Sequence, residues 1–154
     1  MFNIPYMEWD ETRLSDDSRA WFIATYPGKV VGIPTASWLF VCEIPHPRCL
    51  CLHIFDAPAS GWVHRAICEI AATNTPPDLL VTDETRLQHA LVSVGSSFTK
   101  PAKAYIDKSL MGMPEIPAFL RCLEEVLNDP LFQKQSIGEK NATFDSWRTK
   151  YNLR

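Results

Sequence analysis

Glycine is scarce in this sequence: the 154 residues contain six glycines and 12 prolines. This balance favours stiff connections and interrupted elements over flexible linkers. No uninterrupted apolar run reaches the roughly 18 residues of a membrane-spanning helix, so we predict no membrane span. Residues 1–13 lack a basic start. We therefore expect no secretory signal and a cytoplasmic protein.

Several motifs that would mark an enzyme are missing too. There is no Gly-rich loop of the Walker type, no G-x-G-x-x-G and no G-x-S-x-G. These absences exclude the common nucleotide-phosphate loops and the nucleophile elbow. Hydrophobic residues make up 46% of the chain and charged residues 21%, which is typical of a packed protein. We predict a single domain over 1–154, with an irregular N-terminal segment 1–28, a core 29–128 and a C-terminal helical tail 129–154.

The chain also lacks an excess of positive charge, because 15 Lys and Arg stand against 18 Asp and Glu, a net charge of -3. This excludes a strongly basic nucleic-acid coat but allows a local basic patch. The candidates for DNA contact are Lys100, Lys103 and Lys108, with Tyr105 interleaved. The alternative is a solvated basic face, which is the more common role of such residues.

The cysteines number five, and without an export signal they indicate reduced thiols in the protein interior. Two of them lie close in sequence to two histidines, in the order His46, Cys49, Cys51, His53. Alternation along a strand would place the last three on one face, where they could hold Zn²⁺. The favoured alternative is that these thiols pack in the core beside a histidine.

Hydrophobic patterning predicts an α/β domain. Two apolar segments separated by Pro45-His46-Pro47 should form an antiparallel hairpin. Later segments alternate between helix and strand, so at least one strand pair should be parallel. The segment 18–26 could form a short strand or one helical turn. The expected strands are Lys29–Ile33, Ser37–Ile44, Arg48–Phe55, Leu79–Thr82 and Ala104–Ile106; the expected helices are Trp62–Thr73, Leu87–Val94 ending at Gly95, Ile116–Leu127 and a short terminal helix capped by Thr143.

Acidic residues stand at the ends of three of these strands: Glu43, Asp56 and Asp83. Because α/β proteins place ligands at strand ends, the three carboxylates could converge on a divalent cation. Carboxylate oxygens suit Mg²⁺ or Mn²⁺, which can serve two-metal phosphoryl transfer. The alternative, which spacing alone favours, is that these acids are caps and solvated loop residues.

Two stretches carry a family resemblance. The first contains the strand WLFVCE, then CLCLHIFDAPASGW, then PPDLLVTDET; the second is the chain end FDSWRTKYNLR. The region from Trp38 to Leu91 resembles the catalytic core of the DDE transposase and retroviral-type integrase superfamily. That family has an acid-bearing strand, a hairpin, an Asp-x-x-Ser-Gly loop, a helix and a strand ending in Thr-Asp-Asn-Gly. The chain end resembles the tail of bacterial insertion-sequence transposases.

The resemblance implies an RNase H-like fold, a mixed sheet with helices on its faces. It also implies that Glu43, Asp83 and Glu115 are the catalytic acids and would bind two Mg²⁺ or Mn²⁺ ions for DNA cutting and joining. Two features depart from the family: Glu84-Thr85 replaces Asn-Gly, and Glu43 is longer than the usual first Asp. We therefore expect a transposase- or integrase-core homologue with impaired catalysis.

A second hypothesis is a cytoplasmic protein-interaction module without catalysis, which could form a homodimer. Its basis is the acidic balance of charge and the aromatic residues of the N-terminal segment. Tyr6, Trp9 and Trp21 are expected to be exposed and to contact a partner. Salt-sensitive DNA binding would favour the first hypothesis, and a dimer indifferent to DNA would favour the second.

Overall fold

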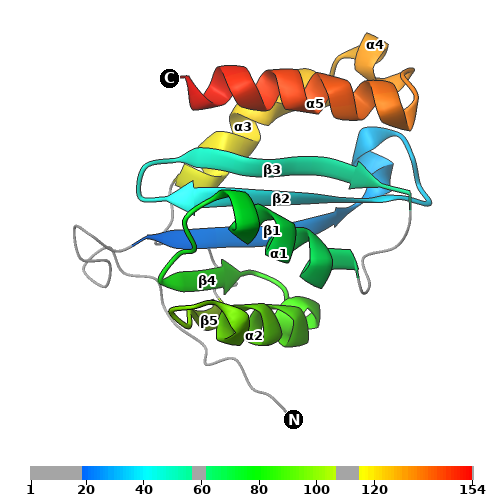
Figure 1. The fold of residues 1–154 in the computed structure, drawn as a ribbon. Helices are drawn as coiled ribbons and strands as arrows, with labels where there is room; N and C mark the ends of the chain where they lie inside the picture. Colours follow the sequence, from blue (N-terminus) through cyan, green and yellow to red (C-terminus); the bar gives the residue numbers. More distant parts are fainter. Residues whose placement is uncertain (1–18, 57–61, 107–114, 154) are drawn as a thin grey trace.

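The computed structural model describes residues 19–56, 62–106 and 115–153 (Figure 1). These residues form a five-stranded sheet in the order β3-β2-β1-β4-β5. Strand β2 runs antiparallel to both β1 and β3, whereas β4 is parallel to β1 and to β5. The strands are β1 (Ala20–Pro27), β2 (Ser37–Ile44), β3 (Arg48–Phe55), β4 (Leu79–Thr82) and β5 (Lys103–Ile106). The predicted α/β class, the hairpin and the parallel strand pair are confirmed.

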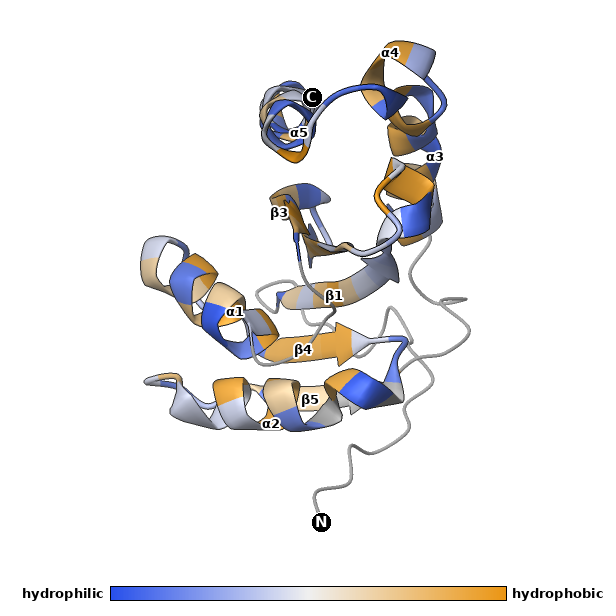
Figure 2. Ribbon diagram, turned by 90° about the vertical axis from the view of Figure 1, so that its right-hand side faces the viewer, coloured by the Kyte–Doolittle hydropathy of each residue, from blue (hydrophilic) through white to orange (hydrophobic). Residues whose placement is uncertain are grey.

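Helices lie on both faces of this sheet (Figure 2). One face packs against α1 and α2 and buries a cluster that includes Trp21, Leu80 and Leu91. The other face packs against α3, α4 and α5 and buries a cluster that includes Phe40, Phe119 and Phe144. The helices are α1 (Trp62–Thr73), α2 (Gln88–Ser97), α3 (Glu115–Leu127), α4 (Pro130–Gln133) and α5 (Ile137–Asn152), with short 3-10 turns η2 (Gly28–Val31) and η3 (Thr85–Leu87). Within the described residues, no helix has both the length and the apolarity to cross a bilayer.

The central strand comes from the segment that we expected to be irregular. Its sequence, AWFIATYP, is buried over the first six residues because β1 has strands on both sides and helices on both faces. A strand in this position is apolar on both faces, so its sequence shows no alternation. Trp21 is fully buried, and the expectation that it is exposed is wrong. Tyr6 and Trp9 lie outside the described residues.

Two predictions for segments that contain a glycine are wrong. Lys29–Ile33 is no strand: the chain makes η2 and then turns at Gly32, whose φ of 78° favours glycine. The helix α2 does not end at Gly95 but continues to Ser97. A Cβ at Gly95 would lie 2.6 Å from the Ala102 carbonyl oxygen, so this glycine allows α2 to pack closely against the segment before β5.

The terminal helix is longer than predicted and is capped elsewhere. Ser136, not Thr143, is the N-cap of α5, and it forms a capping box with Glu139. The helix lies along the edge strand β3. The side chains of Asn141 and Asn152, three turns apart, each bond both the N–H and the C=O of one β3 residue, Ile54 and Cys49 respectively, at 2.7–3.0 Å. These amides replace a neighbouring strand and protect the edge of the sheet.

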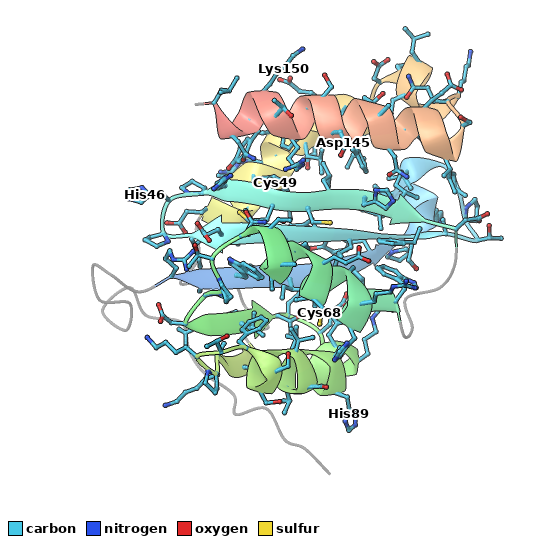
Figure 3. All side chains as sticks on the ribbon, viewed as in Figure 1. His46, Cys49, Cys68, His89, Asp145 and Lys150 are labelled. Carbon is cyan, nitrogen blue, oxygen red and sulfur yellow. The ribbon has the colours of Figure 1, made fainter. Side chains whose placement is uncertain are left out.

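The three predicted zinc ligands of β3 do not all share a face: Cys51 and His53 line one pocket, and Cys49 lies on the other side. A register shift between Val41 and Cys42 marks a bulge in the β2–β3 pairing, which interrupts the alternation of side chains. Cys49 therefore joins the cluster under α3 and α5, whereas Cys51 packs with the opposite cluster. His46 lies at the β2–β3 turn (Figure 3). Burial raises the pKa of Cys51 to about 12, which keeps it a protonated thiol and not a zinc-binding thiolate. The alternative, thiols packed in the core, describes this strand better.

Candidate functional site

The carboxyl ends of β1 and β4 bring polar side chains together, and Thr25 and Thr82 are fully buried there. The two strands are parallel neighbours, with Phe22 opposite Val81. Three residues further along each strand, Thr25 of β1 and Glu84 after β4 come to the same level. Strand ends of this kind are where α/β proteins usually bind ligands, since side chains from neighbouring strands meet there.

An arginine joins these two strand ends. The Arg86 guanidinium donates from Nη2 to the Thr25 Oγ1 at 2.8 Å and to the Thr25 carbonyl oxygen at 3.1 Å. Its Nε donates to a Glu84 carboxylate oxygen at 2.9 Å. The Thr25 hydroxyl donates to the same Glu84 oxygen at 3.0 Å. The Arg86 side chain is about half exposed, so its guanidinium lies between the two strand ends and the solvent.

Asp83 lies beside this arginine but is not paired with it. One carboxylate oxygen, Oδ1, is buried and has no hydrogen-bond partner among the described residues. Burial raises the pKa of Asp83, and the neighbouring Glu84 carboxylate raises it further. Such a group costs free energy when it is charged and unpaired, which is typical of a residue kept for something other than stability.

Tyr26 forms the wall of the site towards α3. Its ring stacks on Phe40 at 5.7 Å between centroids and lies against Trp38 at 5.0 Å. Burial raises the pKa of the phenol far above its usual range, with further contributions from Asp83 and Glu84. Tyr26 is therefore a neutral phenol at physiological pH, in a locally acidic environment.

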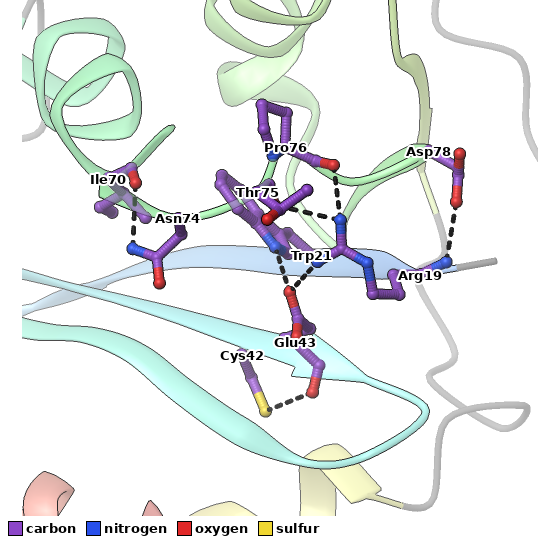
Figure 4. Close-up of polar contacts among 9 residues, drawn as sticks. All are labelled: Arg19, Trp21, Cys42, Glu43, Ile70, Asn74, Thr75, Pro76 and Asp78. Atoms are coloured by element: carbon purple, nitrogen blue, oxygen red, sulfur yellow. Dashed lines mark hydrogen bonds and ion pairs between the residues drawn. The ribbon is translucent and has the colours of Figure 1, made fainter. Parts of the chain in front are cut away.

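Glu43 lies away from this site, near the amino end of β1. Glu43 pairs with Trp21 in the sheet, and Trp21 pairs with Leu80 of β4. Asp83 comes three residues after Leu80, so it lies about 10 Å beyond the level of Glu43 along the strand direction. The Glu43 Oε2 accepts from the Arg19 guanidinium at 2.7 Å and from Trp21 Nε1 at 3.0 Å (Figure 4). The prediction that Glu43 and Asp83 hold a common ion therefore conflicts with the positions of their strands.

Glu115 is not brought to Asp83 either. It begins α3, as predicted. Burial, with a smaller contribution from the charge of Glu115, raises the pKa of Cys42 to about 12. Cys42 pairs with Phe22 in the amino-terminal half of β1. Asp56 is exposed at the end of β3, with β2 and β1 between it and β4. Among the described residues, no three His, Cys, Asp or Glu side chains form a metal-binding group.

The predicted DNA-binding lysines lie at the β5 side of the sheet. Lys100 is 87% exposed and makes a 3.2 Å ion pair with Asp78. Lys103 begins β5 and is exposed. Lys108 lies outside the described residues. The two described lysines are thus near the end of the sheet that carries Arg19 and Glu43, because Lys103 pairs with Leu79 at the start of β4.

Sequence reasoning missed Thr25, Tyr26 and Arg86, because the segment that carries the first two could equally be a short strand or one helical turn. A signal was present: the apolar run AWFIA ends in Thr-Tyr just as the run LLV ends in Thr-Asp. Two apolar runs with polar ends indicate parallel strands that present their polar residues at one edge. Comparison with models of protein families and with curated proteins finds no match for this chain.

Proposed function

We propose that this chain is an RNase H-like core of the transposase and integrase type in which the arginine Arg86 has replaced the catalytic metal ions. On this proposal the protein no longer cuts or joins DNA and acts by binding alone. The sheet supports it: four strands run one way, β2 runs against them, helices cover both faces, and Asp83 follows β4 directly. The five free thiols support a reducing compartment such as the cytoplasm.

The observation that carries the proposal is the set of atoms around Arg86. Its guanidinium is held by a carboxylate of Glu84 and by the hydroxyl and carbonyl oxygens of Thr25. Carboxylate, hydroxyl and carbonyl oxygens are also the ligands that a hard divalent cation takes. Because a tethered guanidinium always carries its charge, it competes permanently with a dissolved metal ion for these oxygens.

A guanidinium cannot do the chemistry of the ion that it would replace. A catalytic metal ion lowers the pKa of a bound water and turns it into a nucleophile, and it needs an open coordination position to do so. Arg86 donates hydrogen bonds and has no such position. Glu84 is occupied by Arg86, which leaves Asp83, whose buried Oδ1 has no hydrogen-bond partner among the described residues, as the carboxylate not bonded to the arginine. One carboxylate is too few ligands for two metal ions.

The test is a metal titration of the wild-type chain and of Arg86→Gln. Paramagnetic Mn²⁺ broadens the NMR signals of backbone amides near its binding site, so the amides of Thr25, Asp83 and Glu84 report binding directly. We expect little broadening in the wild type at millimolar Mn²⁺ and clear broadening in Arg86→Gln. The matched control is Arg65→Gln, which removes an exposed arginine that pairs with Glu69 on α1.

The same proteins are then incubated with duplex DNA and Mg²⁺ or Mn²⁺. We expect no cleavage and no strand joining by the wild type. Cleavage that is lost in Asp83→Asn would overturn the proposal. Equal Mn²⁺ broadening in the wild type and in Arg86→Gln would overturn it as well, because the arginine would then not be occupying the site.

A further inference from the structure

A cavity of about 340 Å³ lies at the edge strand β3, between α1 and α5. Figure 2 shows α5 over this edge of the sheet and α1 to one side of β3. The volume lies within the usual range for small-molecule sites. The cavity is separate from the contacts of Arg86, because β2 lies between β3 and the strand β1 that carries Thr25.

Four residues of α5 form a stripe along the side of the helix that faces β3: Asn141, Asp145, Arg148 and Asn152. Their spacings of four, three and four residues place them on one side of a helix. The outer two, Asn141 and Asn152, bond the backbone of β3. The inner two, Asp145 and Arg148, line the cavity.

The inner pair of this stripe is unpaired, in contrast to the outer pair. Within the described part of the chain, the side chains of Asp145 and Arg148 make no ion pair and no hydrogen bond. Burial keeps the pKa of the Cys51 thiol high, and Arg148 lowers it whereas Asp145 raises it. Since Cys51 is in the cavity wall, both charges act on the cavity.

The charges around the cavity decide which kind of ligand fits. A ligand with only a carboxylate would be repelled by Asp145 and by Glu69, which lines the cavity from α1. A ligand with only an ammonium group would leave the Arg148 guanidinium without a partner. A ligand that carries both charges satisfies both residues of α5.

The spacing of the two residues sets the distance between the ligand's charges. Side chains three residues apart on a helix are neighbours, with their Cβ atoms about 5–6 Å apart. The ammonium and carboxylate of the ligand must therefore be close together, as they are on the single α-carbon of an amino acid. The remaining wall offers apolar surface from Phe55, Ala66 and Ile70.

We propose that this cavity binds a free α-amino acid with an apolar side chain. The Arg148 guanidinium donates to the ligand's carboxylate, for which its planar fork is suited, and Asp145 accepts from the ammonium. The apolar side chain packs against Phe55 and Ile70. This proposal does not rest on the loss of metal chemistry at Arg86, since it uses other residues and another kind of ligand.

The experiment compares three probes with the same branched apolar tail: L-leucine, 4-methylpentanoate and 3-methylbutylamine. The first carries both charges, the second only the carboxylate and the third only the ammonium. Each is titrated into the full chain, and the NMR shifts of the backbone amides of Cys51, His53 and Ile70 report binding at the cavity. We expect L-leucine to move these signals and to bind at least about tenfold more tightly than either other probe.

Two variants assign the two charges. Arg148→Gln should weaken L-leucine about tenfold without weakening 3-methylbutylamine, and Asp145→Asn should weaken L-leucine similarly without weakening 4-methylpentanoate. The matched controls are Arg121→Gln and Glu125→Gln, two exposed residues of α3 that do not line the cavity. Both should bind L-leucine as the wild type does.

A third variant blocks the cavity without changing charge. Ala66→Trp fills it from α1 and should abolish the L-leucine shifts, whereas Ala72→Trp, at an exposed position of α1, should not. If Ala66→Trp does not fold, the two charge variants still decide. The proposal is overturned if L-leucine moves no cavity amide, if a probe with one charge binds as tightly as L-leucine, or if Arg148→Gln and Asp145→Asn bind it as their controls do.

Discussion

The two ends of β1 are built from similar residues and treated differently. Each end has an arginine, a glutamate and a residue of β1 that contacts the glutamate. At the amino end, Arg19 and Trp21 both donate to Glu43, and Arg19 also reaches the carbonyl oxygens of Thr75 and Pro76. The Glu43 carboxylate thus has charge-assisted hydrogen bonds, which are the strong kind.

The carboxyl end is satisfied only in part. Arg86, Glu84 and Thr25 are bonded to one another, but the buried Oδ1 of Asp83 is unpaired. Trp38, near the same end, also has an unpaired indole N–H. Unpaired buried polar groups lower stability, so selection for stability alone would remove them. Of the two ends of β1, we therefore expect this one to bind a ligand. The amino end, in contrast, has the properties of a structural clamp.

The largest expected effect comes from breaking the amino end. Glu43→Ala removes the acceptor of both Arg19 and Trp21 and leaves a buried indole N–H and a partly buried guanidinium unpaired. We expect a loss of about 2 kcal/mol in the free energy of unfolding. Denaturant unfolding followed by tryptophan fluorescence measures it.

The control for this change is Glu124→Ala. Glu124 is an exposed glutamate on α3 with a cavity on one side, so its removal should change stability by less than about 0.5 kcal/mol. Glu43→Gln keeps an oxygen acceptor without the charge and should fall between the two. If Glu43→Ala is as stable as the wild type, the amino end is no clamp and the comparison fails.

A smaller effect is expected from pH. The contributions of Asp83 and Asp78 to the free energy of unfolding should change with pH in opposite directions at the two ends of β1. Burial raises the pKa of Asp83 in the folded state, so its contribution to stability falls as pH rises from the usual carboxyl range through that folded pKa. Asp83→Asn removes this penalty. Relative to the wild type, the variant should gain up to about 1 kcal/mol between acidic and neutral pH.

Asp78 at the amino end should behave in the reverse way. The backbone N–H of Arg19 lowers the pKa of Asp78, and Lys100 lowers it further. Its contribution is therefore present above the usual carboxyl pKa and is lost as pH falls through the lower folded value. Asp78→Asn should lose stability at neutral pH and little at acidic pH. Stability differences of the same sign for the two variants would contradict this assignment.

Most of the sheet could be predicted from the sequence, and the reason is local. Three strands have the predicted bounds, because Pro, Asp or turn residues flank them in the sequence: Ser37–Ile44, Arg48–Phe55 and Leu79–Thr82. The strand β1 could not be assigned from the sequence, because it is buried on both faces and its residues show no alternation of apolar and polar side chains. Only its three-dimensional neighbours, β2 and β4, distinguish it from one turn of a helix.

The site could be predicted only in part. Asp83 at a strand end was recognisable, since a polar residue after an apolar run marks such a position. Glu43 follows the same rule on β2, but β2 runs antiparallel to β4, and so its carboxyl end lies at the opposite edge. Strand direction is a tertiary property, and the spacing of residues does not encode it. Arg86 could not be foreseen at all, because its role comes from the position of Thr25 on a distant strand.

The smallest expected effect concerns the two described lysines beside the amino end. Lys100→Ala and Lys103→Ala together remove exposed charges, so stability should change little. If these lysines contact DNA phosphates, the double variant should bind duplex DNA more weakly and lower the salt dependence of the binding constant by roughly two counterions. Lys134→Ala with Lys150→Ala, on α4's exit and on α5, is the matched control. Gel-shift titrations at several salt concentrations measure the effect, and light scattering measures the oligomer.

A stable dimer whose weak DNA binding is unaffected by both double lysine variants would contradict the DNA-binding role. It would favour a protein-interaction module, because the lysine charges would then contribute nothing to recognition.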